Sequence, residues 1–345
     1  MQIFHRYHEL LGRLDARGHE HRILGRAPDG APIVCVRAGG DKTPAIFISA
    51  GSHSTEQAGV SAAMELIDTL DTEHQVYVIP CRDPIGLNGF NYALSLSLDD
   101  EPEMSDQDAA MALLRERGEV LHDEEDLLVA IIGEHGYFSR VRHGWSVEQV
   151  PALEPLKGRR IYCMAGSEKI EGSAMLQRAY SLIVDPEGQI LHINRFHDTA
   201  WAPAEARVTR DQLARIHPGL ILDLHEHGGD GFWFSARHQG NDDDEQWEHR
   251  MADVMIGAVE EAGFDLMPDD YLPGSFFSKS RNSVYWLDPR KRGEGFNLSD
   301  FGALEYGPAF TIETGMTTGF DNRVNASLLA ARTAINVFEE RHKSS

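Results

Sequence analysis

The stretch ISAGSHSTEQAG, residues 48–59, ends an apolar run and begins a helical pattern, with His53 and Glu56 three positions apart at the junction. A His and a Glu at this spacing in the first turn of a helix lie on one side, where both can reach one metal ion. The same residues also suit a surface pair or a helix cap, with Ser54 or Thr55 as the capping residue. Alone, the pair does not distinguish a metal site from these structural roles.

Strand and helix patterns alternate on both sides of this stretch. Short apolar or β-branched runs predict strands at 32–38, 45–50, 75–80, 219–224 and 309–313. Apolar residues at helical spacing predict helices at 55–70, 204–216, 243–263 and 322–342. This alternation predicts an α/β fold, which we expect to be a mixed, mostly parallel twisted sheet with helices on both faces.

The length of 345 residues is enough for one large domain with a full hydrophobic core. We expect a single domain over 1–345, decorated by an irregular insertion at about 99–180 that is acidic at its start. The three cysteines, Cys35, Cys81 and Cys163, are odd in number and widely spaced. This pattern argues against a disulfide framework and is typical of a reducing compartment.

The formal net charge of -23 disfavours nucleic acids and anionic membranes as partners, because both require basic patches. Acidic runs at 99–108, 122–126 and 241–248 are typical of solvated loops or helix starts, with recruitment of basic substrates as the alternative. The opening residues have no apolar targeting segment, and no run of about 18 apolar residues occurs. We therefore expect a cytoplasmic protein without a membrane span; its oligomeric state is left open.

A second motif supplies the remaining ligand for a metal site. GLILDLHEHGG, residues 219–229, is an apolar strand that ends in His225, Glu226 and His227. Functional side chains of α/β sheets collect just past the carboxyl ends of strands. Two imidazoles and one carboxylate leave a fourth position of zinc open for water, which is typical of hydrolytic sites. We expect His225 to be the ligand, and His227, on the same side of the strand, to have a supporting or structural role.

A third motif places an acid at the end of another strand. AFTIETG, residues 309–315, contains Glu313 among otherwise uncharged residues. Desolvation there would raise the pKa of its carboxyl toward the range useful for proton transfer. An acid that caps a turn or pairs with an arginine would give the same pattern.

These motifs, in this order, resemble the zinc carboxypeptidase family of the carboxypeptidase A and B type across most of the chain. AGSHSTE stands where that family has its His-x-x-Glu zinc motif, QILHINRFHDTAW (189–201) resembles the segment with an Asn-Arg pair, and FTIETG resembles the strand with the catalytic Glu. The resemblance implies the family's carboxypeptidase-like fold, a phosphorylase/hydrolase-like sandwich. It also implies one zinc ion per chain and hydrolysis of the C-terminal amide bond of peptides by a metal-activated water.

Site roles follow from the resemblance position by position. Zinc is assigned to His53, Glu56 and His225, and the general base and acid to Glu313. Asn194 and Arg195 are assigned to the terminal carboxylate of a peptide substrate, with Arg195 also counted as catalytic. Independently of the family, the planar fork of an arginine suits a carboxylate, although a structural ion pair is the alternative for Arg195.

Two of the family's residues cannot be assigned from this sequence. The arginine that stabilises the oxyanion has several candidates: Arg82, Arg140, Arg142, Arg159, Arg160 and Arg178. The tyrosine that covers the substrate has three: Tyr271, Tyr285 and Tyr306. Specificity for the last side chain is also open, and Asp300 is the one charge noted in FNLSDFGAL that could select a basic residue.

Two other functions compete with the peptidase. The related aspartoacylase and succinylglutamate desuccinylase group uses the same fold and ligands to cleave small N-acyl amino acids. The HSTE motif and the Asn-Arg segment resemble the peptidases more closely. A binding module that has lost catalysis is disfavoured, because His53, Glu56, His225 and Glu313 are all present.

Overall fold

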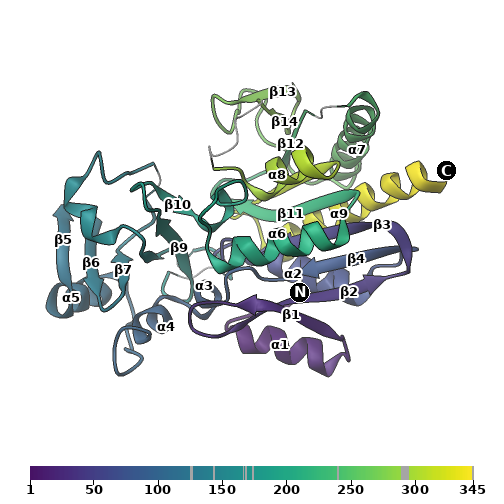
Figure 1. The fold of residues 1–345 in the computed structure, drawn as a ribbon. Helices are drawn as coiled ribbons and strands as arrows, with labels where there is room; N and C mark the ends of the chain where they lie inside the picture. Colours follow the sequence, from purple (N-terminus) through teal and green to yellow (C-terminus); the bar gives the residue numbers. More distant parts are fainter. Residues whose placement is uncertain are drawn as a thin grey trace.

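The computed structural model describes residues 1–124, 127–142, 144–165, 167, 169–172, 175–238, 241–288 and 295–343. The described residues form two sheets, a larger one of nine strands and a smaller one of six. In Figure 1 the smaller sheet, β5 to β10, extends to one side of the body that contains the larger sheet.

The larger sheet has the order β1-β2-β4-β3-β11-β15-β12-β14-β13. Its strands are β1 (His21–Arg26), β2 (Pro32–Gly39), β3 (Lys42–Ala50), β4 (His74–Ile79), β11 (Leu220–His227), β12 (Trp233–Arg237), β13 (Phe277–Arg281), β14 (Val284–Leu287) and β15 (Ala309–Gly315). The four central strands, β4, β3, β11 and β15, are mutually parallel, and antiparallel pairs lie toward both edges. The carboxyl ends of β3, β11 and β15 therefore meet at one edge of the sheet.

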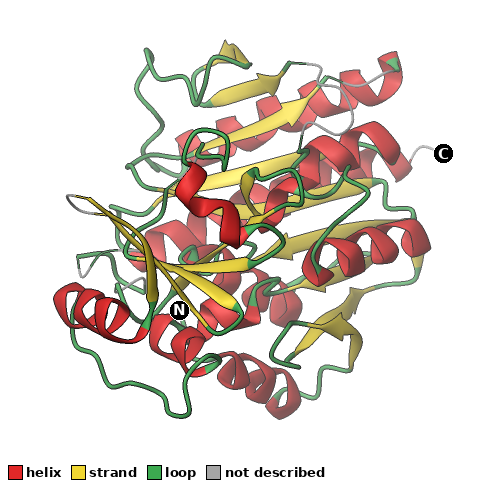
Figure 2. Cartoon of the chain, turned by 60° about the vertical axis from the view of Figure 1, so that its left-hand side comes forward, coloured by secondary structure: helices red, strands yellow, loops and turns green. Residues whose placement is uncertain are grey.

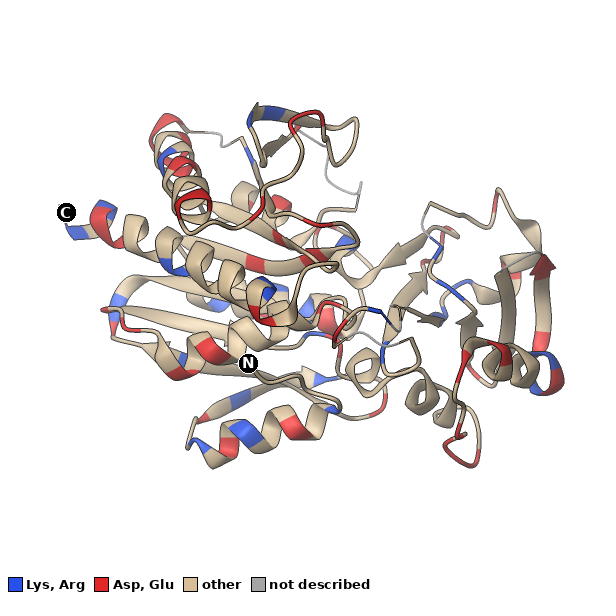
Figure 3. Ribbon diagram, turned by 180° about the vertical axis from the view of Figure 1, so that it is seen from behind, with Lys and Arg blue, Asp and Glu red and all other residues tan. Residues whose placement is uncertain are grey.

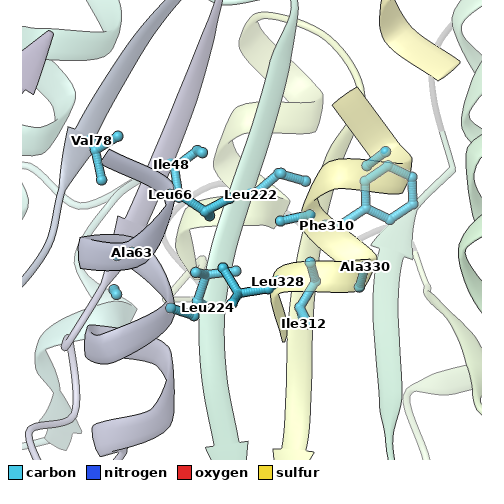
Figure 4. Close-up of a cluster of buried hydrophobic side chains, with 14 of the residues drawn as sticks. Ile48, Ala63, Leu66, Val78, Leu222, Leu224, Phe310, Ile312, Leu328 and Ala330 are labelled. Atoms are coloured by element: carbon cyan, nitrogen blue, oxygen red, sulfur yellow. The ribbon is translucent and has the colours of Figure 1, made fainter. Parts of the chain in front are cut away.

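Helices cover both faces of this sheet. The helices α1 (Tyr7–Ala16), α2 (Gln57–Thr69), α7 (Asp242–Glu261) and α9 (Phe320–Lys343) pack on one face, and α6 (Ala204–Ile216) and α8 (Leu298–Glu305) on the other. Leu222 and Leu224 of β11 contact the first group (Figure 4), whereas Ile221 belongs to the cluster on the opposite face. Because side chains alternate along a strand, Asp223 and His225 lie on the α6 and α8 face.

The smaller sheet has the order β10-β9-β8-β7-β6-β5 and its own hydrophobic cluster. Its strands are β5 (Glu119–Glu124), β6 (Leu127–Ile132), β7 (His135–Phe138), β8 (Arg160–Met164), β9 (Ala179–Val184) and β10 (Ile190–His192). The helices α3 (Pro84–Asn88), α4 (Phe90–Ser95) and α5 (Gln107–Arg117) and the 3-10 turn η1 (Pro151–Leu156) accompany it, and η2 (Ile193–Arg195) leads away from β10. Figure 2, turned so that this side comes forward, shows the smaller sheet in front of the larger one.

The element pattern expected from the sequence is confirmed for the larger sheet and its helices. The five predicted strands correspond to β2, β3, β4, β11 and β15, and the four predicted helices correspond to α2, α6, α7 and α9. The stretch 99–180, expected to be irregular, contains α5, the strands β5 to β8 and the first two residues of β9 where it is described. The single-domain interpretation stays a prediction.

Charged residues are distributed unevenly over the chain. Figure 3 shows acidic residues along α7 and on the outer part of the smaller sheet. The acidic run at 241–248 forms the beginning of α7, capped by Asn241, as expected for a helix start. The run at 122–126 lies in β5 up to Glu124, and its last two positions are outside the described residues. Within the described ranges, every helix is too short or too polar to cross a bilayer.

Candidate metal and catalytic site

The three side chains expected to bind metal lie together at the edge where β3 and β11 end. His53 follows β3, Glu56 immediately precedes α2, and His225 lies in β11. One donor atom from each lies within 4.8 Å of the others, and all three residues are buried. The parallel pairing of β3 with β11 brings these segments together, although 169 positions separate Glu56 from His225.

The donor atoms of this cluster face one another. His53 Nδ1 is 2.6 Å from Glu56 Oε1, and His225 Nδ1 is 2.7 Å from Glu56 Oε2. Burial alone would raise the pKa of Glu56, but the imidazoles of His53 and His225 outweigh it and lower this pKa to about 2. Burial lowers the pKa of His53 despite its contact with Glu56. A carboxylate and an uncharged imidazole are the forms that bind a cation. Burial acts to lower the pKa of His225, but the carboxylates of Asp223 and Glu56 outweigh it and raise this pKa well above its usual value, so His225 must lose a proton when a cation binds.

A buried polar network orients His225 from behind. The other ring nitrogen, Nε2, is hydrogen-bonded to Asp223 Oδ2 at 2.8 Å. Arg82, fully buried, donates to both oxygens of Asp223, at 3.1 and 3.2 Å. A carboxylate on the outer nitrogen of a metal-binding histidine fixes its ring and its tautomer. Asp223 could have been found from the sequence, since it lies two positions before His225 and therefore on the same face of the strand.

Asn194 belongs to this network. Its Nδ2 donates to Asp223 Oδ2 at 3.0 Å and lies 3.2 Å from His225 Nε2, while its Oδ1 accepts from Arg82 at 2.8 Å. The side chain is buried, with 3% of the residue exposed. The structure thus places Asn194 behind a ligand histidine, and its expected contact with a substrate carboxylate stays a prediction.

Two residues that the sequence did not reveal support His53. Its Nε2 is hydrogen-bonded to His192 Nδ1 at 2.8 Å, and its ring stacks on Tyr180 with centroids 4.8 Å apart. Arg195 Nε donates to His192 Nε2 at 3.1 Å. Tyr180 and His192 lie in β9 and β10, so their approach to His53 depends on the docking of the smaller sheet, for which the sequence gives no signal.

Glu313 lies beside His225 on the neighbouring strand. The two residues are paired in the register of β11 and β15, strands that lie about 4.8 Å apart. Glu313 Oε2 is buried, and no hydrogen-bond partner is found for it within the described ranges. Burial raises the pKa of Glu313 to about 8, and the carboxylates of Glu56 and Asp223 add to this effect against the opposing influence of His225.

His227 has a local contact that accounts for its position. Its Nε2 is 2.9 Å from the carbonyl oxygen of Gly231, and its Nδ1 accepts from the backbone N–H of Gly229 at 3.2 Å. These bonds close the turn between β11 and β12. The structure therefore places His227 in the structural role that was one of its two expected roles.

A cleft of about 620 Å³ opens next to His192 and Tyr180, the two side chains that contact His53. Arg195, His192 and Tyr180 line one side of it. Residues 144–146, Gln149, residues 189–191 and Phe276 complete the lining. The smaller sheet and its loops therefore form much of the wall, and Arg195 is positioned to meet a ligand in the cleft.

The arginine candidates for an oxyanion are distributed widely. Arg82 is held in the network behind His225, and Arg178 donates to the backbone carbonyls of Gln177 and Phe4. Arg142 lies over the ring of Trp145, at 5.3 Å from its centroid. Arg159 and Arg160 line a separate cavity of about 650 Å³, together with Arg26 and Arg207. Of these five arginines, Arg82 is the one that contacts Asp223 and Asn194, the side chains behind His225.

Of the three tyrosine candidates, Tyr271 is influenced by Glu313. Burial raises the pKa of Tyr271, and the carboxylate of Glu313 raises it further. Tyr285 is buried and donates to the carbonyl oxygen of Tyr271 at 3.1 Å. Tyr306 follows the last residue of α8 and packs against His217 and Phe301. Among the three candidates, the pKa shift of Tyr271 is the one to which Glu313 contributes.

Comparison with solved structures shows a shared fold at low sequence identity. A metallo-carboxypeptidase from Pseudomonas aeruginosa, solved with (2-guanidinoethylmercapto)succinic acid, is similar over 98% of this chain and 71% of its own, with 13% identity and a TM-score of 0.54. A metallo-carboxypeptidase from Burkholderia cenocepacia is similar over 97% of this chain and 69% of its own, with 9% identity and a TM-score of 0.52. The chain has the fold of the metallo-carboxypeptidases.

The same fold recurs in a bovine protein, thrombin-activatable fibrinolysis inhibitor, solved with tick carboxypeptidase inhibitor. It covers 98% of both chains, with 12% identity and a TM-score of 0.50. No family model and no curated protein matches the sequence. The expected carboxypeptidase-like α/β fold is therefore confirmed by structural comparison, and the chemistry is inferred from the side chains of the site.

The residues at the site fit a divalent metal ion. Two imidazole nitrogens and two carboxylate oxygens converge, which is a donor set typical of zinc. Both histidines have a partner on the outer ring nitrogen, His192 for His53 and Asp223 for His225. For His225, whose outer nitrogen meets a carboxylate, this second contact is the usual arrangement of a histidine that binds metal.

Proposed function

We propose that this protein is a zinc-dependent metallopeptidase that hydrolyses the C-terminal amide bond of peptides. The observation that carries the proposal is the juxtaposition of His53, Glu56 and His225 with the carboxyl of Glu313. That carboxyl lies on the same face as His225 and has an oxygen without a hydrogen-bond partner among the described residues. The carboxypeptidase fold supports the same assignment.

The three ligand side chains would hold zinc, with Asp223 and His192 orienting the two histidines. Zinc bound there would polarise the scissile carbonyl and acidify a water molecule. The network behind His225 keeps its Nδ1 directed toward Glu56, so the donor atoms need little rearrangement before a cation binds.

Glu313 would act as the general base and then as the general acid. Its Oε2 would accept a proton from the attacking water and deliver it to the nitrogen of the leaving amine. The absence of a competing hydrogen bond at this oxygen, within the described residues, leaves it available for both transfers.

Arg195 would recognise the free carboxylate of the substrate. Its side chain lines the cleft beside His192, and a guanidinium can donate two parallel hydrogen bonds to a carboxylate. Recognition of this group would restrict cleavage to the last residue of a peptide.

A second candidate function is deacylation of N-acyl amino acids. It is favoured by the size of the cleft, about 620 Å³, because this volume is typical of sites for small molecules. Residues 144–146 and Gln149, which belong to the smaller-sheet region, contribute part of the wall of this cleft. The two functions share the ligands, the base and the carboxylate recognition, and differ in the group that leaves.

The experiment that tests the proposal is digestion of a random peptide pool by the zinc-loaded protein. Mass spectrometry should detect the loss of single C-terminal residues, and a parallel incubation with N-acyl amino acids should show whether acyl groups are released. Removal of a general base typically costs 10²- to 10⁴-fold in rate, so Glu313→Gln should lose activity at least to that extent while it retains metal.

Release of acyl groups alone would replace the peptidase with the deacylase. A wild-type protein that binds zinc and hydrolyses neither substrate class would refute both. Equal activity in wild type and Glu313→Gln would refute the role of the base.

A further inference from the structure

A second cluster of His and Glu side chains lies where β12 ends and α7 begins. His238 follows β12, while Glu245 and His249 are one helical turn apart in α7. One donor atom from each lies within 4.8 Å of the others. These residues come from segments different from those of the first cluster, and the function proposed above does not use them.

The donor atoms meet at one carboxylate oxygen. Glu245 Oε1 is 2.9 Å from His238 Nδ1 and 3.8 Å from His249 Nε2. The spacing of four positions places Glu245 and His249 on the same side of α7, which faces the end of β12. Two imidazole nitrogens and a carboxylate oxygen therefore surround one small volume.

The indole of Trp286 holds both imidazoles in place. The ring of His238 is stacked on it, with centroids 5.1 Å apart and an interplanar angle of 20°, and the ring of His249 lies 4.2 Å away. Trp286 itself is 2% exposed, and its Nε1 donates to Ser280 Oγ at 2.8 Å. Because the indole is fixed, the two histidines are pre-positioned on a rigid platform, which lowers the cost of ordering them around an ion.

The surroundings of the cluster are anionic and accessible to solvent. Asp242, Asp243 and Asp244 share the first turn of α7 with Glu245, and Arg341 pairs with two of them. The three candidate ligands have side-chain exposures between 34% and 44%, so water can fill the remaining coordination positions. Imidazole nitrogen with carboxylate oxygen suits zinc and the neighbouring transition metals, and does not suit calcium or magnesium.

We propose that His238, Glu245 and His249 form a second binding site for a divalent transition-metal ion such as Zn²⁺. The ion would join the end of β12 to the start of α7. Since β12 pairs directly with β15, the strand that contains Glu313, this link would brace the part of the sheet next to the first cluster. The first cluster accounts for one ion, so the protein would bind a second one, more weakly, at this exposed position.

Calorimetric titration of the metal-free full-length protein with Zn²⁺ tests the proposal. Wild type should bind two ions per chain, one for each cluster. His249→Gln and His238→Gln should each lose the weaker event and keep the tighter one, whereas His53→Gln should lose the tighter event and keep the weaker. His8→Gln, the same substitution at an exposed histidine outside both clusters, should bind as wild type does.

A thermal measurement separates ligation from misfolding. In the His53→Gln background, saturating Zn²⁺ should raise the melting temperature by a few degrees, because the ion binds only the folded arrangement of β12 and α7. The shift should vanish when His249→Gln is added, with an unchanged circular dichroism spectrum.

Wild-type stoichiometry in both His238→Gln and His249→Gln would overturn the second site, as would complete loss of binding in His53→Gln. Neither result depends on whether the protein hydrolyses peptides, so failure of this proposal is distinguishable from failure of the proposed activity.

Discussion

Glu313 occupies surroundings that oppose its ionisation. Burial and the nearby carboxylates of Glu56 and Asp223 raise its pKa to about 8 in the metal-free protein. A carboxyl with a raised pKa in the folded state destabilises the fold as pH increases, because the unfolded chain ionises first, near pH 4.5. The group that would perform the chemistry therefore reduces stability at neutral pH.

Glu313→Gln should stabilise the metal-free protein at neutral pH. The free energy of unfolding at pH 8 should increase on the order of 1 to 3 kcal/mol, discounted from the full shift because the side chain is partly exposed. The gain should disappear near pH 4, where the carboxyl is protonated in both states. Urea unfolding of wild type and variant at both pH values measures it, and a destabilised variant at pH 8 would contradict the expectation.

The decrease of activity at low pH should also depend on the protonation of Glu313. Hydrolysis should fall as pH decreases because a protonated Glu313 cannot accept a proton, and the raised pKa places this decrease above the ordinary range of glutamate. A bound cation would lower the pKa of Glu313 toward its ordinary value. Activity would still fall as pH decreases, but the fall would occur at a lower pH. A profile of kcat/KM against pH provides the test, and the residual activity of Glu313→Gln should lack this decrease.

Asp223 should act through His225 and not through the substrate. Asp223→Asn removes the charge that faces His225 Nε2 and also leaves buried Arg82 without its anionic partner. Loss of such a supporting contact typically weakens metal affinity 10- to 100-fold. Competition with a zinc chelator measures this, and unchanged affinity would show that the contact does not orient the histidine.

Residue-level expectations succeeded where the sequence pattern encodes position along a strand or helix. The spacing of His53 and Glu56 and the strand-end positions of His225 and Glu313 were sufficient to predict residues that the structure brings together. Asn194 shows the limit of this reasoning, because its side chain turns into the network of Arg82 and Asp223. The direction in which such a side chain points depends on tertiary contacts, which a local sequence pattern does not contain.

At the scale of elements, the packing of α2 on β11 sets the geometry of the ligands. A Cβ at Gly59, in the first turn of α2, would lie 2.8 Å from the backbone carbonyl oxygen of Leu224. Glu56 immediately precedes this helix and His225 immediately follows Leu224. The close approach of the two backbones therefore fixes the separation of two ligands.

Gly59→Ala should push α2 away from β11. The overpacking should cost about 1 to 3 kcal/mol of stability, and the widened gap between Glu56 and His225 should weaken zinc binding. The matched control is Gly257→Ala in α7, where an added Cβ has no atom within 4 Å. That change should leave zinc affinity unaltered and stabilise the helix by about 0.5 to 1 kcal/mol. Thermal unfolding and zinc titration of both variants measure the effects, and an unperturbed Gly59→Ala would refute the spacing role.

The elements themselves were predictable to different degrees. The helices of the larger sheet have long amphipathic patterns, and α6 was predicted with its observed limits. The smaller sheet was not predicted, because its strands are short and come from a stretch without a regular alternation of helix and strand. Tyr180 and His192 could not be assigned to the site for this reason.

At the scale of the whole molecule, the smaller sheet and its loops form most of the described cleft lining, and Phe276, which precedes β13, completes it from the side of the larger sheet. The candidate metal cluster and Glu313 lie in the larger sheet and in the segment that joins β3 to α2, whereas the smaller sheet and its loops supply Trp145, Tyr180 and His192. The candidate metal cluster and most of the described cleft lining therefore belong to different parts of the structure.

Trp145→Ala should change selection without changing the chemistry. Trp145 lines the cleft but is absent from the ligand cluster, so KM for a short substrate should rise on the order of 3- to 10-fold with little change in kcat. Trp201→Ala provides the control, since Trp201 is 41% exposed and lines the separate arginine-rich cavity. Steady-state kinetics on dipeptides and longer peptides measures the effect, and a loss confined to kcat would contradict it.

The smaller sheet lies between Glu56 and His225 in the sequence. His53 and Glu56 precede the smaller sheet and His225 follows it, so that sheet and all of the described cleft lining except Phe276 are encoded between them as one continuous segment. Insertions into that segment, or its exchange, would alter most of the cleft lining and leave His53, Glu56, His225 and Glu313 unchanged on either side.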